Sequence, residues 1–562
     1  MCKEQYTIGV DYGSLSARGV LVRVRDGEIA AEAEFAYPHG IITGALPDGT
    51  PLPGDWFLEH PQDYLDAMSF IVPRLRAQSG IPAAQIVGLA IDFTCSTMVP
   101  LDKQGQALCL NEAYASRPHA WVKLWKHHGA KPQAEALQRV SEAQGRPYPD
   151  WYGGVISQET LTAKVLEVFA QDRAVYNAAD AFVDAGDYVT SQMAGEMCFS
   201  LPMAAAKAFW CKESGYPDAA FFGAIDPALA DMPQQKLMAH FPNAKRGYPG
   251  QGVAKLCAAW AERLGLCPGI ALCPAQLDAY AALPGLGVTG PGEALMVVGT
   301  SMALLTMQTD RVLVPGVTAC LPDTFYPGMW CYACGQSSLG DIFQWFVENY
   351  VPADYVQAAK ERGMSVHTYL TELARKMEPG DSGLVALDWF NGNRSCLANP
   401  RLSGMLLGLG LQTRPEEIYR ALLEAVVFGA RSIFDTFAAS GAPIEEVVLC
   451  GGIPMKNTLL NQMYADILRR PIRVSACKQA PALGSAINAA AAAGVMPLSE
   501  AIARMHDGAF HVYTPDEARA VRYDLLYAEY ARLSDCFGRG ENRVMERLLA
   551  MRAAGKERKR GR

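Results

Sequence analysis

The sequence predicts an α/β protein of more than one domain. Its 562 residues exceed what one hydrophobic core supports, and a chain of this length divides into about two to four domains. Segments of helical periodicity alternate with short apolar segments typical of strands, which is the pattern of α/β folds. A strand, a polar turn and a second strand also recur in both halves of the chain. This recurrence favours two similar lobes, although so simple a pattern also arises by chance.

Strands dominate the first hundred residues. Residues 6–11 form an apolar run that ends in the turn Asp11-Tyr12-Gly13-Ser14, and residues 19–24 and 32–37 follow as a second and a third strand. Residues 61–78 have helical periodicity. Residues 86–92 then read as a buried strand that ends just before Thr94.

The same order of elements returns in the second half. Residues 294–298 form a strand that ends in the turn Gly299-Thr300-Ser301, and residues 303–306 continue as the next strand. An amphipathic helix over residues 415–437 precedes a strand at 447–449, which ends in Gly451-Gly452. Residues 516–562 are helical in pattern and finish in a basic run at 556–562, which we expect to be a solvated, frayed tail.

Composition and charge narrow the functional classes. Half of the residues are apolar, 19% are charged and the net charge is -8, so we expect a well-packed globular protein with no attraction for nucleic acid or an anionic membrane. No stretch is long and apolar enough to span a bilayer, and the first residues lack the apolar core of a signal peptide. We therefore expect a cytoplasmic protein that acts on small molecules and keeps its 15 cysteines reduced.

Three strand ends offer parts of a phosphate site. Phosphate needs converging backbone N–H groups, small residues that let it approach and a carboxylate for Mg²⁺. Asp11 with Gly13 and Ser14 supplies a carboxylate beside an open turn, residues 299–301 supply amides and hydroxyls, and residues 451–452 supply bare backbone. Each turn alone is weak evidence for a phosphate site, because glycine in a turn is usually there for the backbone conformation that the turn requires. Together, at the ends of apolar strands, they favour a nucleotide site.

Competing motifs are weaker. The sequence has no G-x-x-x-x-G-K-[ST] segment, which excludes a P-loop. Residues 285–290 match G-x-G-x-x-G, but Pro291, Gly292 and then a strand follow, where a dinucleotide site requires a helix. Cys331 and Cys334 form a single CxxC pair, for which a metal or redox role is the minor interpretation because zinc sites usually need a second pair.

Asp278 is the best candidate for a catalytic base. Transfer of a phosphoryl group to a hydroxyl needs a carboxylate that accepts the hydroxyl proton where water is excluded. Asp278 lies in the mostly apolar segment 274–280, directly before the second lobe. The alternative is a structural one, in which Asp278 caps the N-terminus of a short helix through Ala282.

At this point the sequence resembles the FGGY carbohydrate kinases, and among them most closely the branch that phosphorylates L-ribulose. The resemblance covers nearly the whole chain. Its motifs are residues 8–14 (IGVDYGS), 122–128 (VKLWKHH), 298–301 (VGTS), 335–337 (GQS) with 340–341 (GD), 388–394 (DWFNGNR), and 450–452 (CGG) with 456–457 (KN).

The resemblance implies two actin-like (ribonuclease H-like) α/β lobes around a central cleft, followed by a helical C-terminal tail. The implied domains are a sugar-binding lobe over residues 1–287, an ATP-binding lobe over residues 288–506 and a helical extension over residues 507–562. Closure of the lobes would exclude water from the phosphoryl group.

The resemblance also implies roles for single residues. Asp278 corresponds to the catalytic base and Asp11 to the residue near Mg²⁺. The ATP phosphates would lie against Gly13, Ser14, Gly299, Thr300 and Ser301, and the adenosine against Gly451, Gly452 and Asn457. The sugar would contact Thr94, Trp125, Lys207, Asp278 and Gln336. For Lys207 the alternative is a surface lysine, although the neighbouring Phe209 and Trp210 suggest partial burial.

Three departures from the family pattern lie around the sugar. The L-ribulose branch has a sugar-binding glutamate where this chain has Ala333, a tryptophan where it has Thr160 beside Glu159, and a histidine where Tyr280 follows Asp278. Because a buried polar group without a partner is costly, losing one hydrogen-bonding group changes or relaxes specificity.

The expected function is ATP-dependent phosphorylation of L-ribulose to L-ribulose 5-phosphate, with Mg²⁺. One alternative is a kinase of the same family for another ketose or a pentitol, which rests on the three departures. The other is a non-catalytic sugar or nucleotide sensor, against which the retained Asp11 and Asp278 speak. We expect a sugar and ATP as partners, with neither nucleic acid nor a membrane, and we include a homodimer among the expected assemblies.

Overall fold

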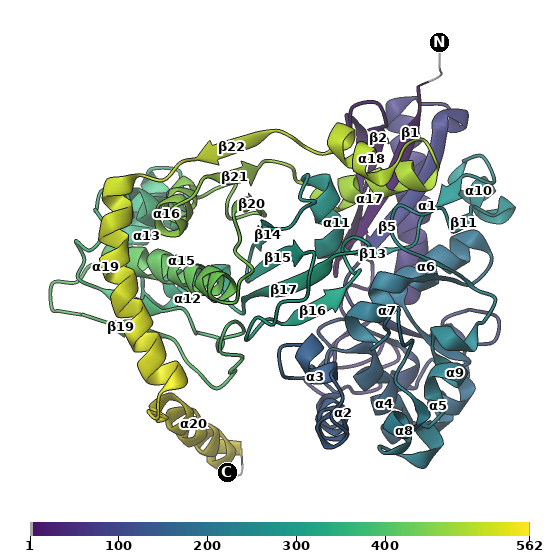
Figure 1. Ribbon diagram of the computed structural model, residues 1–562, viewed down its shortest axis with the longest axis horizontal. Coiled ribbons are helices and arrows are strands. Elements are labelled where there is room, and N and C mark those ends of the chain that lie inside the picture. The colour runs from purple at the N-terminus through teal and green to yellow at the C-terminus, as the bar shows by residue number, and fades with distance from the viewer. Residues whose placement is uncertain (1–3, 561–562) are drawn as a thin grey trace. The chain divides into compact units, whose positions relative to one another are not determined.

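The structure is a computed structural model that describes residues 4–560 and divides into two compact units (Figure 1). The first unit runs to Thr289 and adds Leu321–Met329 and Gln479–Gly508. The second unit holds Gly290–Cys320, Trp330–Lys478 and the chain from Ala509 on.

The first unit is built on a seven-stranded sheet of order β11-β12-β5-β1-β2-β3, to which β13 adds beside β5. β1, β2 and β3 form an antiparallel meander, and β5 runs parallel to β1, as β12 and β13 do to β5. The strands are β1 (Tyr6–Tyr12), β2 (Ser16–Arg23), β3 (Ile29–Ala36), β5 (Ile86–Phe93), β11 (Ala254–Lys255), β12 (Ala271–Leu272) and β13 (Gln276–Leu277). The strands expected in the first hundred residues are confirmed.

Two helices cover opposite faces of this sheet, α1 (Pro61–Ser79) and α17 (Ala480–Ala492). Glycines let both approach closely. A Cβ at Gly19 of β2 would lie 2.3 Å from the side chain of Ile71 in α1, and a Cβ at Gly9 of β1 would lie 1.8 Å from the carbonyl oxygen of Ala482 in α17. The helix expected at residues 61–78 is therefore confirmed, and the Ala-rich α17 lies almost backbone to backbone on β1.

The remainder of the first unit surrounds a four-stranded sheet of order β4-β7-β6-β8. Its strands are β4 (Leu58–Glu59), β6 (Met98–Leu101), β7 (Val122–Lys123) and β8 (Ala181–Asp184). The helices of the first unit include α2 (Lys131–Ala143), α4 (Leu161–Gln171), α5 (Arg173–Ala178), α6 (Ala185–Ala194), α7 (Leu201–Lys207), α10 (Ala258–Leu264), α11 (Asp278–Gly285) and α18 (Leu498–Met505).

The second unit has its own seven-stranded sheet, of order β16-β17-β15-β14-β20-β21-β22. The strands are β14 (Glu293–Val298), β15 (Met302–Gln308), β16 (Ala319–Pro322), β17 (Trp330–Gln336), β20 (Glu446–Cys450), β21 (Ile472–Ser475) and β22 (Phe510–Tyr513). The helices include α12 (Gly340–Tyr350), α13 (Ala353–Glu361), α14 (Val366–Ala374), α15 (Pro415–Ala439), α16 (Thr458–Leu468), α19 (Glu517–Ser534) and α20 (Val544–Arg560).

The two sheets repeat one plan. In the first, β3-β2-β1 is an antiparallel meander and β5 lies parallel on the other side of β1. In the second, β17-β15-β14 is the meander and β20 lies parallel on the other side of β14. The turns at 11–14 and 299–301 therefore occupy equivalent places, and the expected internal repeat is confirmed.

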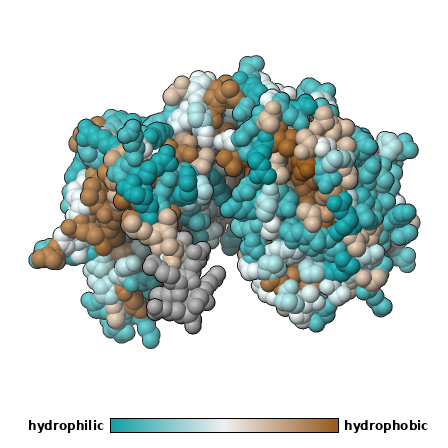
Figure 2. Space-filling model, turned by 90° about the horizontal axis from the view of Figure 1, so that it is seen from below, coloured by the Kyte–Doolittle hydropathy of each residue, from teal (hydrophilic) through white to brown (hydrophobic). Residues whose placement is uncertain are grey.

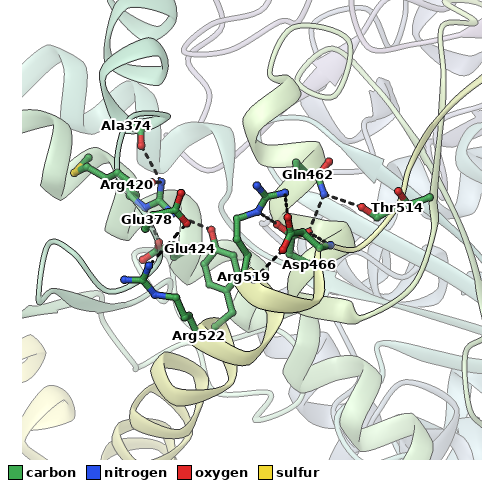
Figure 3. A network of polar contacts seen from close by, with 12 residues as sticks. Ala374, Glu378, Arg420, Glu424, Gln462, Asp466, Thr514, Arg519 and Arg522 are labelled. Carbon is green, nitrogen blue, oxygen red and sulfur yellow. Dashed lines mark hydrogen bonds and ion pairs between the residues drawn. The ribbon is translucent and has the colours of Figure 1, made fainter.

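The C-terminal helix α19 is part of the second unit's core, whereas the sequence suggested a separate extension over residues 507–562. Its Tyr523 is buried against Arg420 of α15. The Nη2 of Arg420 donates to the Tyr523 hydroxyl at 3.1 Å, and the Nε of Arg420 donates to Glu424 at 2.9 Å. Arg519 of α19 pairs with buried Asp466 at 2.8 Å (Figure 3). Helix α20 continues to Arg560, and residues 561–562 of the expected basic tail lie outside the described residues.

The division into units also differs from the predicted boundaries at residues 287 and 506. Residues 479–508 follow the second unit's strands in the sequence but pack with the first unit. The physical reason is α17, whose backbone fits the glycines of β1 and β5: a Cβ at Gly88 would lie 2.5 Å from the carbonyl oxygen of Ala489.

Within residues 4–560, no helix combines the length and apolar character needed to cross a membrane. Hydrophilic residues cover most of the face seen in Figure 2, with apolar residues scattered among them.

Candidate active site

Three carboxylates gather at one end of the first unit's sheet. The parallel register of β1 with β5 pairs Asp11 with Asp92, and β13 pairs Gln276 with Asp92. Asp278 comes two residues later, as the first residue of α11. The carboxyl ends of parallel strands are the usual position of a ligand site in an α/β sheet.

Burial raises the pKa of each of these acids, and the charge of Asp11 adds to the shift of Asp92 and Asp278. Burial raises the pKa of Asp278 to about 7, and the charge of Asp11 adds to the shift. Burial also raises the pKa of Asp11, against the lowering effects of Asp92 and of Arg18 at 4.0 Å. The pKa of Asp92 lies well above its ordinary value, first through burial and then through the charge of Asp11. Acids with perturbed pKa values at strand ends are characteristic of catalytic sites.

Asp92 is a member of this group that the sequence did not single out. It is fully buried, and Ser485 of α17 donates a hydrogen bond of 2.6 Å to its Oδ2. Its Oδ1 has no hydrogen-bond partner among the described residues. An acidic residue near the end of a buried strand could have indicated Asp92 from the sequence. Only the pairing of β5 with β1, however, places Asp92 beside Asp11.

The capping alternative for Asp278 is not formed. The N-cap of α11 is Leu277, and the Asp278 Oδ1 accepts only from the adjacent N–H of Ala279, at 2.6 Å, and not from an amide further along the helix. A carboxyl group that is largely buried and has one backbone donor keeps an oxygen available for a substrate proton.

Trp125 and Ser14 lie together in the first unit. The Trp125 indole N–H donates to the Ser14 hydroxyl at 3.0 Å, and 37% of Trp125 remains exposed. The turn that bears Ser14 is closed by a bond of 3.0 Å from the N–H of Gly13 to the carbonyl of Ser16. A residue predicted to contact sugar thus touches one predicted to contact phosphate.

Lys207 and Thr94 belong to the same neighbourhood. Lys207 ends α7, is half-buried and lies 5.9 Å above the ring of Tyr152, so the expected partial burial is confirmed. Thr94 is buried, with its hydroxyl 2.7 Å from that of Thr97. Burial raises the pKa of the Cys95 thiol to about 12, while Lys207 lowers it and Asp278 raises it. Lys207, predicted to bind sugar, and Asp278, the predicted base, thus both lie close enough to Cys95 to affect its pKa, in opposite directions.

Glu159 adds an ionised carboxylate here. Burial acts to raise its pKa, but a hydrogen bond with His128, at 3.3 Å, and the charges of Lys207 and Lys164 hold the pKa below its ordinary value. An ionised acid beside a lysine is suited to binding sugar hydroxyls.

The structure shows where each of the three departures from the family pattern lies. Thr160 is the N-cap of α4 and accepts from the N–H of Ala163 at 3.3 Å. Tyr280 packs edge-on against Phe325, with ring centroids 4.4 Å apart. Ala333 lies in β17 of the second unit.

The turn at Gly299-Thr300-Ser301 joins β14 to β15 in the second unit and meets the start of α12. The N–H of Gly299 donates to Ser301 at 2.9 Å, and the N–H groups of Leu339 and Gly340 donate to the carbonyls of Thr300 and Gly299 at 2.7 and 3.1 Å. Thr300 is exposed. An open turn beside a helix N-terminus is an electrostatic arrangement that favours phosphate.

Gly451 and Gly452 follow β20 next to that turn. A Cβ at Gly451 would lie 2.4 Å from the carbonyl oxygen of Val298, the last residue of β14, whereas a Cβ at Gly452 would meet nothing within 4 Å. Asn457 caps α16, accepting from the N–H of Leu460 at 3.0 Å. Gly452 is thus open to a ligand, and Asn457 has a structural role whether or not it contacts adenosine.

Gln336 is buried inside the second unit. Its Nε2 donates to Asp388 at 2.7 Å and to the carbonyl of Val426 at 2.8 Å. Both amide hydrogens of Gln336 are therefore used within the protein. The predicted contact of Gln336 with sugar stays a prediction, and only its Oε1 atom could make it.

The competing motifs carry no site. Residues 285–290 end α11 and lead into β14, so no helix follows them. Cys331 and Cys334 are buried in β17, three residues apart and therefore on opposite faces of the strand.

One metal-like group occurs among the described residues, formed by His39, His60 and Asp63 at the start of α1. One ring nitrogen of each histidine is already engaged: His39 Nδ1 bonds Asp63 at 2.7 Å, and His60 Nδ1 accepts from the N–H of Gln62 as the helix cap. We therefore interpret this group as a structural cap of α1.

Comparisons with known proteins agree with this geometry. Residues 294–493 match the family model described as "FGGY family of carbohydrate kinases, C-terminal domain". The chain is 42% identical to a ribulokinase of Shouchella clausii, over 98% of this chain and 99% of the relative, and 43% identical to a ribulokinase of Halalkalibacterium halodurans, over 98% of each. Among solved structures, a gluconate kinase from Lactobacillus acidophilus aligns with a TM-score of 0.77 and 18% identity, covering 95% of this chain and 98% of that one. A xylulose kinase from Rhodospirillum rubrum aligns with a TM-score of 0.76 and 22% identity, covering 94% and 98%.

The repeated sheet plan and the groups at the strand ends define a sugar kinase fold. The chain belongs to the FGGY family of carbohydrate kinases. The predicted family, fold class and ATP-dependent kinase activity are thereby confirmed, whereas the roles of single residues stay predictions.

Proposed function

We propose that this chain transfers the γ-phosphoryl group of ATP to the terminal hydroxyl of L-ribulose, forming L-ribulose 5-phosphate and ADP. The observation that carries the proposal is Asp278, a largely buried carboxyl group at a strand end with a pKa raised to about 7. Relatives named ribulokinase, at 42–43% identity over nearly the whole chain, support L-ribulose as the acceptor.

In the proposed reaction Asp278 acts as the general base. As the sugar oxygen forms its bond to phosphorus, the hydroxyl proton moves to the Asp278 carboxylate and the bond from the γ-phosphorus to ADP breaks. A base with a pKa near the operating pH combines a useful ionised fraction with a strong enough pull on the proton.

The two units divide the remaining tasks in this proposal. The first binds sugar through Thr94, Trp125 and Lys207, and the second binds ATP at the turn 299–301 and at the glycines 451–452. The dipole of α12, whose N-terminus lies beside the turn, would stabilise negative charge on the phosphates, and the exposed Thr300 would offer its hydroxyl. Gln336 is the least supported of the proposed sugar contacts, because its amide hydrogens are used internally.

A magnesium ion fits the acids of the first unit. The side chain of Asp11 is 13% exposed, and Asp92 has a buried oxygen without a donor, so both offer the hard oxygen ligands that Mg²⁺ prefers. When bound, Mg²⁺ would neutralise charge on the phosphates. We propose Asp11 as the residue that holds it.

A panel of sugars tests the proposal. The purified protein, Mg²⁺ and ATP are assayed for ADP release with L-ribulose, other ketopentoses and pentitols. We expect L-ribulose to have the highest kcat/KM. A higher value for another ketose or a pentitol would favour the alternative based on Thr160, Tyr280 and Ala333, and binding without any turnover in calorimetry would indicate a sensor.

We further propose that the enzyme works in the cytoplasm, where ATP and free sugars occur together, and that it does so without nucleic acid, since its net charge is -8. A homodimer stays a prediction, which light scattering of the purified chain would test.

A further inference from the structure

Lys164 of α4 is a fully buried lysine with an unusual set of partners. Its Nζ donates to the carbonyl oxygens of Ser96 at 2.7 Å, Leu124 at 2.9 Å and Trp125 at 3.4 Å. An ammonium group has three N–H donors, so backbone carbonyls satisfy all of them. Among the ion pairs of the described residues, Lys123 has a carboxylate partner, Glu167 at 3.1 Å, whereas Lys164 has none.

The three carbonyls come from two separate segments. Ser96 belongs to the turn that follows β5 and contains Thr94, while Leu124 and Trp125 follow β7. The Ser96 backbone has a left-handed φ of 61°, which is strained for a residue with a side chain, and its hydroxyl donates to the carbonyl of Glu159 at 2.8 Å. A strained turn keeps its conformation only where surrounding contacts fix it.

Stability alone does not account for a charge in this place. Removing an ammonium group from water is costly, and a well-packed apolar side chain of similar volume is often neutral or stabilising. The cost shows in the pKa of Lys164, which burial lowers to about 7 although Glu159, Cys95 and Asp184 act to raise it. What the ammonium group provides and an apolar side chain would not is a fixed link between the two segments.

We propose that Lys164 is a positioning residue for the sugar site, whose ammonium group holds the Thr94–Ser96 turn and Trp125 in one fixed arrangement. The proposal rests on the proposed function in one respect, the assignment of Thr94 and Trp125 to sugar binding. Lys164 itself is enclosed by carbonyls and acts through these neighbours.

The test compares Lys164→Met with the matched control Lys236→Met. Lys236 is also in the first unit and donates to a backbone carbonyl, that of Ala179, outside both segments. We expect K164M to raise the sugar KM by about tenfold or more, since small misplacements of binding groups have effects of this size, and to leave the MgATP KM within about twofold. K236M should leave both KM values unchanged.

Hydrogen exchange gives a second readout that does not depend on turnover. In K164M, peptides covering residues 94–97 and 122–128 should exchange faster than in the wild type, and peptides of the second unit should not. A double-mutant cycle with Trp125→Phe should be non-additive in kcat/KM, because Lys164 acts through Trp125. Equal shifts of both KM values, unchanged exchange or full additivity would overturn the proposal.

The kinetic arm uses whichever sugar the wild type phosphorylates best, so a wrong sugar assignment does not affect it. If the wild type phosphorylates no sugar, the proposed function fails and the exchange arm still decides whether Lys164 links the segments. If K164M does not fold, Lys164→Gln replaces it, because its amide retains two N–H donors without charge. Failure of both variants to fold would show a structural role and overturn the proposal.

Discussion

Replacing Asp278 with asparagine should abolish most activity and at the same time stabilise the fold. The amide keeps the size of the side chain, and its oxygen can still accept the 2.6 Å bond from the N–H of Ala279. It cannot accept the sugar proton. General-base catalysis contributes about 10²- to 10⁴-fold, so kcat should fall by that factor, which is about 3 to 5 kcal/mol of transition-state stabilisation.

The gain in stability follows from the raised pKa of Asp278. Its ordinary value is 3.8 and its value in the fold is about 7. A folded-state pKa above the unfolded one means that the folded state holds more protons between about pH 4 and 7, so the free energy of unfolding falls as pH rises through that range. The shift corresponds to roughly 4 kcal/mol above pH 7 as an upper limit, since the side chain keeps some solvent contact. Asparagine carries no charge and escapes this penalty.

The pH dependence of the wild type gives an independent check. With a pKa of about 7, the ionised fraction of Asp278 is about 91% at pH 8 and about 9% at pH 6. The value of kcat/KM, which reports the free enzyme, should therefore fall roughly tenfold from pH 8 to pH 6. The residual activity of D278N should not follow this profile.

The assay is initial-rate ADP release at saturating ATP over a pH series, with thermal unfolding of both proteins at pH 8. D278N should be nearly inactive and have the higher Tm. The reasoning is refuted if D278N keeps kcat within about threefold of the wild type, or if it is inactive and also less stable at pH 8.

Further substitutions test the packing and the nucleotide site. Gly452→Ala adds a Cβ in open space, so the variant should fold normally but have a higher KM for ATP. Gly451 has a φ of 108°, and a Cβ there would lie 2.4 Å from a carbonyl oxygen. Gly451→Ala should therefore destabilise the second unit by about 1 to 3 kcal/mol, measured by urea unfolding. Gly9→Ala would press on the α17 backbone at 1.8 Å and should lower the Tm sharply, with Gly54→Ala, which meets nothing within 4 Å, as the neutral control. Arg420→Met should destabilise by about 3 to 5 kcal/mol by leaving a buried glutamate unpaired. Normal stability of G9A or of R420M would contradict the packing described.

The sheets could be predicted from the sequence because their signals are local. The strands that became β1 and β14 are apolar runs bounded by polar turns, so the turns at 11–14 and 299–301 could be located before any pairing was known. The helix at residues 61–78 was equally clear, since its apolar face repeats at helical spacing.

What could not be predicted depends on contacts between distant residues. The Thr7 hydroxyl of β1 donates a hydrogen bond of 2.8 Å to the carbonyl of Ala486 in α17. Helix α17 also packs closely on β1 because Gly9 has no side chain. Neither contact leaves a pattern within a single segment of the sequence. The compact units group residues 479–508 with the first unit, whereas the prediction ran the second lobe on to residue 506. Asp92 was overlooked for the same reason: an acid at a strand end is ordinarily solvated, and only its pairing with Asp11 makes it part of a site.

The departures from the family pattern at Thr160 and Tyr280 bear on the proposed sugar specificity in different ways. Thr160 caps α4, the helix that carries Lys164, so the change from the family's tryptophan removes a large ring but keeps the start of that helix fixed. Tyr280 instead fills its place by packing on Phe325. In the proposed sugar site the first change would remove bulk and the second would add it, while the charged groups Glu159 and Lys207 remain. We therefore expect any change in sugar preference to follow the shape of the acceptor more than the number of its hydroxyl groups, and a panel of sugars that differ in stereochemistry at equal hydroxyl count would reveal it.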